Sequence, residues 1–387
     1  MDRTLLALAA IAAAVGIYPI VVYPILVRVL AKVRPRPWEE QPATFAIAHV
    51  VTVHNEELRI RAKLENTLAI RYPGGKADIV VASDGSTDGT EAIVAEFASR
   101  NVRWLPCPRK SKENAQITAV GATSAPVIVF SDASTMVDPG SVEALLEPFA
   151  DPEVGAASGA DMVAGEGTGT GEDIYIRYEM ALRRAESVAG SLVGLSGCLF
   201  AARRVVAEAF KDDVPSDLGA ALVCLSMNLR AVHADRARCT YTTTPAIDRE
   251  FRRKRRTALR GLRGLIAYRG ALLGHRFVAT WELLSHKILR FLSPVFLAVS
   301  ALFVLASAAT GNTVALWLSA AFVLGALAVV PALFWEPARR LSLPRALGFF
   351  VLSNAAVVAA LIDLVTGRTA VQWTPTRREA PTAPREP

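Results

Sequence analysis

Apolar residues are concentrated in four long runs near the two ends of the chain. The runs are Leu5–Val27, Phe291–Ala309, Val314–Phe334 and Ala346–Leu364. Each is close to the roughly 20 residues that a helix needs to cross a bilayer. The pattern predicts an N-terminal membrane anchor and a C-terminal group of membrane helices, with a domain of ordinary globular composition between them.

Short apolar runs alternate with helical repeats in the first half of that middle region. Strands are predicted at Phe45–Val53, Ala77–Ala82, Val102–Leu105 and Val127–Phe130, and helices at Glu56–Ile70, Asp88–Arg100 and Lys112–Thr123. The alternation indicates an α/β fold with a mostly parallel sheet covered on both faces. Ligands of such sheets bind beyond the carboxyl ends of the strands, so the polar residues that follow the strands are the candidate site.

The alternation weakens after Gly159. Gly159–Gly171 is rich in Gly and small polar residues and predicts a mobile loop. A helix through Tyr175–Val188, the segment Gly194–Ala202, a helix from Asp217 and a strand near Arg238–Tyr241 follow. The tail after Trp373 is rich in Pro, Arg and Thr, which predicts disorder. We expect an anchor at 1–36, a globular domain at 37–285, membrane helices at 286–367 and a tail at 368–387.

Composition supports a membrane-attached protein. Hydrophobic residues make up 52% of the chain and the mean hydropathy is +0.32. A secretory signal peptide is the alternative for the first run, but its apolar part is longer than a signal core, and no small-x-small cleavage site precedes the charges. The run ends in Arg28, Lys32, Arg34 and Arg36, which is typical of a cytoplasmic flank.

The net charge of +7 arises largely from Arg249–Arg263, in which Arg252–Arg256 are five consecutive basic residues. The stretch has no interleaved aromatic residues and no known nucleic-acid-binding motif, so we expect no nucleic-acid partner. The stretch could meet lipid headgroups or a phosphate, or form the solvated face of a helix. The four cysteines are far apart and form no CxxC pair, which favours neither a zinc site nor a disulfide framework.

Polar clusters follow three of the predicted strands. They are His54–Glu57, Ser83–Thr90 and Ser131–Ser134. Each cluster has a purely structural interpretation: Asp88 and Glu91, for example, fit a helix capping box. Three clusters at one sheet edge together favour a binding site.

The same residues resemble a known family. Asn55-Glu56-Glu57, the stretch from Asp84 to Asp88, a basic helix start and the stretch from Phe130 to Ala133 are similar to the family 2 glycosyltransferases of the GT-A fold. The segments Gly194–Arg204, Ser216–Leu218, Glu250–Lys254 and Ser285–Arg290 extend the likeness to bacterial membrane-bound members, over about 45–295. The resemblance implies an α/β GT-A domain with transmembrane helices.

The resemblance also implies the roles of individual residues. Val53, His54, Glu56 and Asp84 would bind the base and ribose of a nucleotide-sugar donor, and Lys112 and Asp132 would lie near its diphosphate. Gly197 and Cys198 would belong to the acceptor site.

The family holds a divalent cation with an Asp-x-Asp motif, and this chain has Asp132-Ala133-Ser134. The resemblance therefore implies Mg²⁺ or Mn²⁺ at Asp132 and Ser134. One carboxylate can still hold such a cation when phosphate oxygens and water complete the set.

An acceptor hydroxyl must lose its proton as it attacks the sugar, which calls for a carboxylate base. Asp217 matches the family position, while Ser216 replaces the usual acid before it. The alternative role for Asp217 is an N-cap of the helix that it opens. Both roles are compatible with the sequence.

The resulting hypothesis is an inverting transferase that moves one sugar from a nucleotide donor, UDP-linked by preference, to a membrane lipid or lipid-linked glycan. Processive family members carry Gln-x-x-Arg-Trp, and the corresponding stretch Arg253–Thr257 lacks Trp. Arg253 and Arg256 could bind the donor diphosphate or a lipid phosphate. A processive polysaccharide synthase and an inactive scaffold that binds nucleotide-sugar are the alternatives.

Charge asymmetry predicts the orientation in a bacterial inner membrane. Arg339, Arg340 and Arg345 lie between the later apolar runs, whereas the short loop Thr310–Thr313 carries no charge. By the positive-inside rule, the globular domain faces the cytoplasm.

Overall fold

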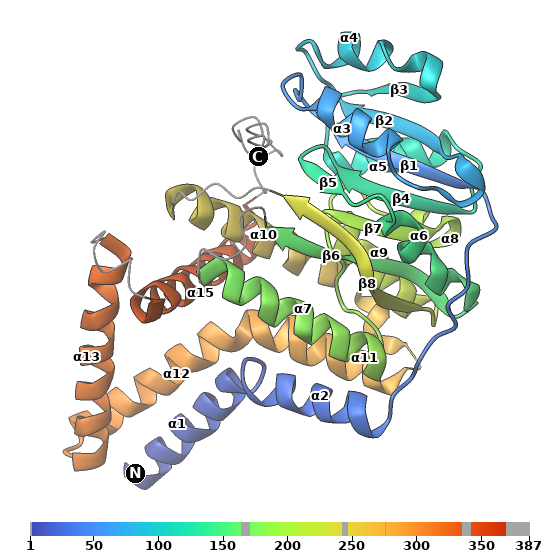
Figure 1. Cartoon of the computed structure of the whole chain (residues 1–387). Helices are drawn as coiled ribbons and strands as arrows, with labels where there is room; N and C mark the ends of the chain where they lie inside the picture. Colours follow the sequence, from blue (N-terminus) through green and yellow to red (C-terminus); the bar gives the residue numbers. More distant parts are fainter. Residues whose placement is uncertain (1, 164–170, 242–246, 275, 335–341, 369–387) are drawn as a thin grey trace, which may run out of the picture.

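The computed structural model describes residues 2–163, 171–241, 247–274, 276–334 and 342–368. It consists of one mixed sheet with helices on both faces, and long helices that project from one side of the sheet domain (Figure 1). Arg339, Arg340, most of the loop predicted at Gly159–Gly171 and the tail after Trp373 lie outside the described residues.

One half of the sheet is parallel, as predicted. Its parallel strands stand in the order β3-β2-β1-β4. Their bounds are β1 (Ile47–Val53), β2 (Asp78–Asp84), β3 (Val102–Cys107) and β4 (Val127–Asp132). Every residue of β1 is buried, because helices cover both faces of this central strand. The pairing of Thr52 with Asp132 and of Val53 with Ser83 brings the ends of β1, β2 and β4 to one edge.

The other half of the sheet is antiparallel in part, so the prediction of a mostly parallel sheet is wrong there. Its strands are β5 (Thr135–Val137), β6 (Val154–Val163), β7 (Leu199–Arg203) and β8 (Arg230–Tyr241). β7 runs antiparallel to both β4 and β6, β8 runs parallel to β6, and β5 is antiparallel to β8. The complete order is β3-β2-β1-β4-β7-β6-β8-β5.

Strand β6 corrects the predicted mobile loop, because Gly159–Val163 belong to it. Gly and Ala are uncommon in strands and made this segment resemble a loop. Here the small residue is required: a Cβ on Gly159 would lie 2.9 Å from the Ala237 carbonyl oxygen and 3.1 Å from that of Leu199. The glycine thus permits close backbone approach between strands.

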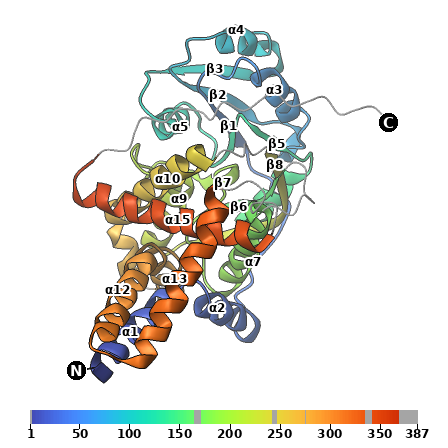
Figure 2. The same cartoon turned by 90° about the vertical axis from the view of Figure 1, so that its left-hand side faces the viewer.

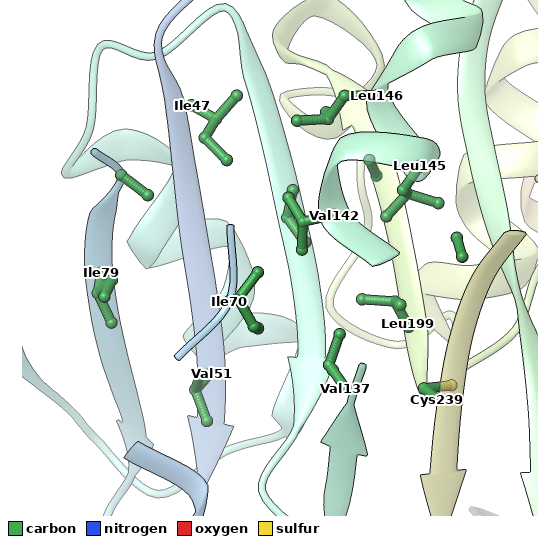
Figure 3. Packing of buried hydrophobic residues seen from close by; sticks show 14 of the residues in the cluster. Ile47, Val51, Ile70, Ile79, Val137, Val142, Leu145, Leu146, Leu199 and Cys239 are labelled. Atoms are coloured by element: carbon green, nitrogen blue, oxygen red, sulfur yellow. The ribbon is translucent and has the colours of Figure 1, made fainter. Parts of the chain in front are cut away.

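Two apolar clusters fill the space on the two faces of the sheet. One contains Ile47 and Val51 of β1 and Val142 and Leu145 of α6 (Figure 3). The other contains Ile128, Phe130 and Phe200, together with residues of α5 and α9. The α-helices of the domain are α3 (Ile60–Leu68), α4 (Thr90–Ala95), α5 (Lys112–Gly121), α6 (Ser141–Leu146), α7 (Gly171–Ala189), α8 (Arg204–Ala207), α9 (Ser216–Ser226) and α10 (Ile247–Ala267). Short 3₁₀ turns lie at Pro73–Gly75, Ala98–Arg100, Glu147–Ala150 and Arg269–Leu273.

The N-terminal apolar run, expected as an anchor over Leu5–Val27, is divided into two helices. α1 (Asp2–Ile17) and α2 (Val22–Val33) are bent by 51° at the break. Pro19 lies in that break; it offers no backbone N–H and disfavours a helical residue before it. α1 lies along α12, whereas α2 packs on α7.

The C-terminal helices begin with a continuous helix over Phe277–Ala309, formed by α11 (Phe277–Glu282), the π-helix η5 (Leu283–Leu289) and α12 (Arg290–Ala309). α13 (Thr313–Phe334) and α15 (Ser342–Val365) follow; Figure 2 shows α12 and α13 beside α1. Within the described ranges, Phe277–Ala309 is the one helix long and apolar enough to cross a bilayer, and the bent α1–α2 pair adds a second if it counts as one span. Four crossings remain a prediction.

Candidate active site

The turns after β1 and β2 are tied together by hydrogen bonds. Asn55 adopts a positive φ of 54°, a conformation that Asn tolerates better than most residues. Its side-chain oxygen accepts from the Thr87 N–H at 2.8 Å, and its own N–H donates to Ser86 Oγ at 3.1 Å. Two of the predicted polar clusters therefore share one edge, as the sequence predicted.

Glu56 is buried and already has a charged partner. The Arg59 guanidinium donates to Glu56 Oε2 at 2.9 Å, and the side chains of both residues are about nine-tenths buried. The Glu56 N–H donates to Thr90 Oγ1 at 2.9 Å, which fixes its backbone as well. Arg59 belongs to no recognised motif, and the sequence analysis did not select it.

Asp84 is fully buried at the end of β2. It accepts from the Lys110 N–H at 2.7 Å and forms an ion pair with Arg109. His54 Nδ1 donates to the Asp84 carbonyl oxygen at 2.8 Å, so the imidazole is held beside the carboxylate, and Val53 before it is buried in β1. Arg109, which the sequence analysis did not select, adds a cation at this edge.

Lys112 and Asp132 form an ion pair across the start of α5 and the end of β4. Asp132 keeps about a third of its side chain exposed, whereas that of Lys112 is 15% exposed. Burial opposes the ammonium charge, but the carboxylates of Asp132, Glu113 and Asp217 keep the pKa of Lys112 above its usual value. Lys112 is thus a fixed cation next to an accessible carboxylate.

The residues around Asp132 fit one kind of metal site only. No group of three His, Cys, Asp or Glu side chains within the described ranges is arranged to hold a metal. Asp132 and Ser134 together offer one carboxylate and one hydroxyl. This set suits a cation that takes most of its ligands from substrate phosphate and water, as Mg²⁺ commonly does, and does not suit a closed protein cage.

A second lysine lies beneath the same turn. Lys63 of α3 is fully buried and donates to the Thr135 carbonyl oxygen at 2.7 Å. Burial lowers its pKa to about 8, although Cys239, Asp132 and Cys198 act in the opposite direction. Lys63 therefore supports the backbone just after Ser134; its helical position gave no sign of this role.

The predicted acceptor segment is joined to Asp132. The Asp132 N–H donates to the Cys198 carbonyl oxygen at 3.3 Å, and the Cys198 N–H donates to Ser196 Oγ at 3.0 Å. Ser196 in turn hydrogen-bonds to the Asp161 carboxylate. Burial raises the pKa of the Cys198 thiol well above its usual value, so the thiol stays protonated.

Asp217 faces the same segment from the first turn of α9. A Cβ added to Gly197 would lie 3.3 Å from Asp217 Oδ2, so the lack of a side chain at Gly197 leaves the carboxylate accessible from that side. The helix begins at Ser216 after Pro215, which makes no side-chain cap, and Asp217 Oδ1 accepts from the Leu218 N–H at 2.9 Å. Asp217 therefore interacts with the first turn without being the N-cap residue.

Basic residues of α10 approach the start of α5. Arg260 pairs with Glu113 at 2.6 Å, next to Lys112. Burial and the nearby Arg260 and Arg253 hold the pKa of Arg256 below its usual value. Arg253 and Arg256 were predicted to bind a phosphate. Arg256 is partly buried near Arg260, whereas Arg253 is exposed.

The opposite side of α10 is held by α15. Arg255 donates two hydrogen bonds to the Asp363 carboxylate, each 2.6 Å long. α10 is therefore contacted on two sides, and within Arg252–Arg256 the exposed residues are Arg252 and Arg253.

Part of the chain matches a known family. Residues 49–210 match the family model Glycosyl transferase family 2. That span contains the donor residues from Val53 to Asp132 as well as Gly197 and Cys198. Asp217 and α10 lie beyond it.

Curated relatives match part of the chain. A hyaluronan synthase of Streptococcus pyogenes is 31% identical over 207 residues, which is 50% of this chain and 49% of that protein. A poly-beta-1,6-N-acetyl-D-glucosamine synthase of Staphylococcus epidermidis is 25% identical over 157 residues, 39% of this chain and 38% of that protein. The chain spans half the length of these relatives or less.

One solved structure resembles nearly the whole chain. The mannosyltransferase PcManGT from Pyrobaculum calidifontis, solved in complex with GDP-Man and Mn²⁺, superposes with a TM-score of 0.72. The match covers 94% of this chain and 99% of that protein at 23% identity. The likeness establishes the GT-A fold, and within that fold residues 49–210 are similar to the glycosyltransferase family 2 domain.

Proposed function

We propose that this chain is an inverting glycosyltransferase that moves a sugar from a nucleotide-sugar donor to an acceptor at the membrane surface. One observation carries the proposal. The Lys112–Asp132 pair and the Asp217 carboxylate flank the Gly197–Cys198 segment. A diphosphate and an acceptor hydroxyl can therefore be bound side by side.

The donor nucleotide would occupy the edge formed by β1 and β2. His54, Glu56 and Asp84 lie there, with Val53 at the end of β1. The carboxylates of Glu56 and Asp84 are held in place by hydrogen bonds and ion pairs and would accept from base and ribose groups. A UDP-sugar was favoured from the sequence, and the mannosyltransferase of similar fold was solved with GDP-Man, so both nucleotides belong in the test.

The reaction needs one bond to form and one to break at the anomeric carbon. The acceptor oxygen attacks this carbon on the face opposite the diphosphate and its proton passes to Asp217, as in general-base catalysis. The bond to the diphosphate oxygen breaks with inversion of configuration. Lys112 and Arg256, with Arg260 nearby, would stabilise the charge that develops on the leaving diphosphate.

Asp132 and Ser134 are the residues that would hold Mg²⁺ or Mn²⁺ together with oxygens of the donor diphosphate. When bound, the cation supplies additional neutralisation of the leaving group. Because Lys112 pairs with the same carboxylate, Asp132 would be shared between the ammonium and the cation.

The acceptor in this proposal is a membrane lipid or a lipid-linked glycan, and the site is a bacterial inner membrane with the globular domain in the cytoplasm. The apolar helix Phe277–Ala309, which follows the domain directly, supports attachment to a bilayer. Proximity of membrane and site would favour acceptors that diffuse in the membrane.

A polysaccharide synthase is the second candidate, because both curated relatives named above are synthases of polymers. The absence of Trp from the α10 sequence favours addition of one sugar. A scaffold that binds donor without transfer is the third candidate, since Ser134 and Ser216 replace two family acids.

The test uses the purified full chain with membrane lipid extract and a panel of UDP- and GDP-sugars, with and without Mn²⁺. We expect one donor to release its nucleoside diphosphate and one sugar to be added per lipid. Long products would favour the synthase. Donor binding without any release of nucleoside diphosphate would favour the scaffold and contradict the proposal.

A further inference from the structure

A basic cavity of about 520 Å³ lies where α2, α7 and α11 meet. Its lining includes Arg34, Arg36 and Arg276, one acid, Glu153, and apolar side chains such as Phe277. Both α2 and α11 pack against α7 (Figure 1). No residue of the proposed transfer mechanism belongs to this lining.

The cavity lies at the opposite sheet edge from the candidate active site. Glu153 comes just before β6, and Asn228, another lining residue, comes just before β8. β6 and β8 run in the same direction as β4, because β7 is antiparallel to both β4 and β6. Asp132, at the end of β4, therefore marks the other edge, and the cavity is a site in its own right.

The charge of the cavity is positive. Arg36 and Arg276 both contact Glu153 Oε2, at 3.4 and 3.2 Å, so the lining has three guanidinium groups and a single carboxylate, which contacts two of them. Buried Arg230 lies behind them, and burial together with the charges of Arg36 and Arg276 holds its pKa below its usual value. A guanidinium cluster of this kind binds a phosphate group well.

Exposed apolar side chains lie on α2, which contributes Leu30 to the lining, and at Phe277. Ile25, Val29 and Val33 lie on one face of α2 with 55%, 52% and 78% of their surface exposed, and Phe277 at the cavity is 84% exposed. Apolar side chains next to arginines are typical of elements that lie in the headgroup region of a membrane. A soluble anion would require the arginines but not this apolar border.

The helix that starts at Phe277 supports the same placement. Its 33 residues correspond to roughly 50 Å at about 1.5 Å per residue. The hydrocarbon core of a bilayer is about 30 Å thick. Because the apolar run Phe291–Ala309 lies at its C-terminal end, the first turns of this helix extend beyond the hydrocarbon core on the side of the globular domain.

We propose that the cavity formed by Arg34, Arg36 and Arg276 binds the phosphate of an anionic phospholipid, whose acyl chains lie against the apolar face of α2 and Phe277. This inference rests on the proposed attachment to a membrane but not on the transfer reaction. The bound lipid would be neither donor nor acceptor, because the cavity lies at the opposite edge of the sheet.

The experiment places the full chain in phosphatidylcholine nanodiscs with increasing phosphatidylglycerol and measures the melting temperature and, by native mass spectrometry, the bound lipid. We expect saturable stabilisation by phosphatidylglycerol. Removal of one arginine near a lipid phosphate weakens binding about five-fold. Arg34→Gln should show that loss, and Arg34→Gln with Arg276→Gln should show roughly 25-fold.

Arg34 is exposed, so its replacement is the gentler change; Arg276 also contacts Glu153 and the Asn228 carbonyl oxygen. The lipid-free melting temperature of each variant therefore serves as the folding control. Arg71→Gln, which alters an exposed arginine paired with Glu143 on the globular domain, should keep the wild-type lipid response.

Four results would overturn the proposal. Equal stabilisation by both lipids, or an unchanged lipid response in the double variant, would contradict the lipid site alone. Equal stabilisation by inorganic phosphate would identify a soluble anion as the ligand. Failure of the wild-type chain to enter phosphatidylcholine nanodiscs would contradict membrane attachment and this inference with it, whereas transfer activity can succeed or fail independently.

Discussion

The two halves of the sheet are stabilised by contacts of very different range along the chain. In the donor half, neighbouring β–α units supply the site, and residues such as Asn55 and Thr87 are about 30 positions apart. The other half, β5 to β8, is covered in part by helix α7. Glu186 of α7 accepts from Tyr23 at 2.6 Å and contacts His286 at 2.6 Å, across 163 and 100 positions. The donor edge is therefore encoded locally, whereas the acceptor side depends on how the long helices dock.

This difference has a functional consequence. Glu179 pairs with Arg290 at 2.7 Å, which connects α7, a helix of the globular domain, to the start of α12. Arg183 of α7 contacts Asp161, the carboxylate that binds Ser196 next to Gly197. Changes in the long helices should thus reach the acceptor segment, while nucleotide binding should be insensitive to them.

The largest expected effect comes from the residue that joins the two halves. Asp132→Ala removes the only carboxylate of the metal motif and leaves Lys112 without this partner, so transfer should fall by at least about 100-fold. Turnover of each donor with Mn²⁺, Mg²⁺ or excess EDTA measures it. The neighbouring exposed Asp138→Ala should remain active. Undiminished wild-type turnover in EDTA would show that the basic residues alone neutralise the diphosphate.

Replacement of Asp217 should separate donor binding from sugar transfer more sharply. Asp217→Asn keeps the size of the side chain but cannot take a proton, and general-base catalysis contributes about 10²- to 10⁴-fold. Donor affinity should be unchanged and turnover should fall by that factor. The exposed Asp213→Asn nearby is the matched control.

A role restricted to the helix start predicts the reverse for Asp217. Asn would then transfer at nearly the wild-type rate, and Ala would lower the unfolding free energy by about 1 kcal/mol. Melting temperature, donor affinity and turnover of both variants decide. If Asp217→Asn is fully active, the base lies elsewhere, and Asp161 beside Ser196 is the next residue to replace.

The same contrast explains which features could be predicted from sequence. Parallel strands with β-branched runs place their ends at one edge, so the proximity of the turns after β1 and β2 followed from the pattern. Arg109 and Lys63 were missed because their partners are brought to them by tertiary packing; Arg59 pairs with Glu56 only three positions away and was missed because such pairs are usually surface contacts. Their charges stand in helices and loops where an exposed position is the usual expectation.

The errors of the prediction have equally local causes. β6 consists largely of Gly, Ala and Ser, and these residues carry little strand propensity until neighbouring strands cover them. The bend between α1 and α2 was readable from Pro19 but was outweighed by the length of the apolar run. The link between Arg255 and Asp363 joins segments 108 positions apart, and no sequence spacing indicates it.

The Arg255–Asp363 link allows another test, and its expected effect is intermediate. Asp363 is nearly buried, but the Arg255 side chain is 37% exposed, so loss of the pair in Asp363→Asn should lower the melting temperature modestly. Transfer should fall several-fold with little change in donor affinity. Arg255→Asp combined with Asp363→Arg should recover part of the loss, and the exposed Arg252→Gln serves as control. A change in donor affinity alone would contradict the proposed division.

The smallest expected effect concerns stability and pH in the donor half. Burial lowers the pKa of Lys63 to about 8, below the unfolded value of about 10.4. Between these values the unfolded chain binds more protons than the folded one, so the Lys63 contribution to stability rises with pH over that window, by at most about 3 kcal/mol. Below pH 8, the buried charge opposes folding in full.

Lys63→Met should therefore flatten the increase of unfolding free energy between about pH 8 and 10 relative to the wild type, while the exposed Lys76→Met should leave it unchanged. Urea unfolding at several pH values measures the slopes, and their difference cancels the titration of other groups. The variant also loses the hydrogen bond to the Thr135 carbonyl oxygen, which shifts its curve down without tilting it. Equal slopes for wild type and Lys63→Met would mean that Lys63 keeps its charge throughout, and that the turn after Ser134 rests on an ammonium group at every pH tested.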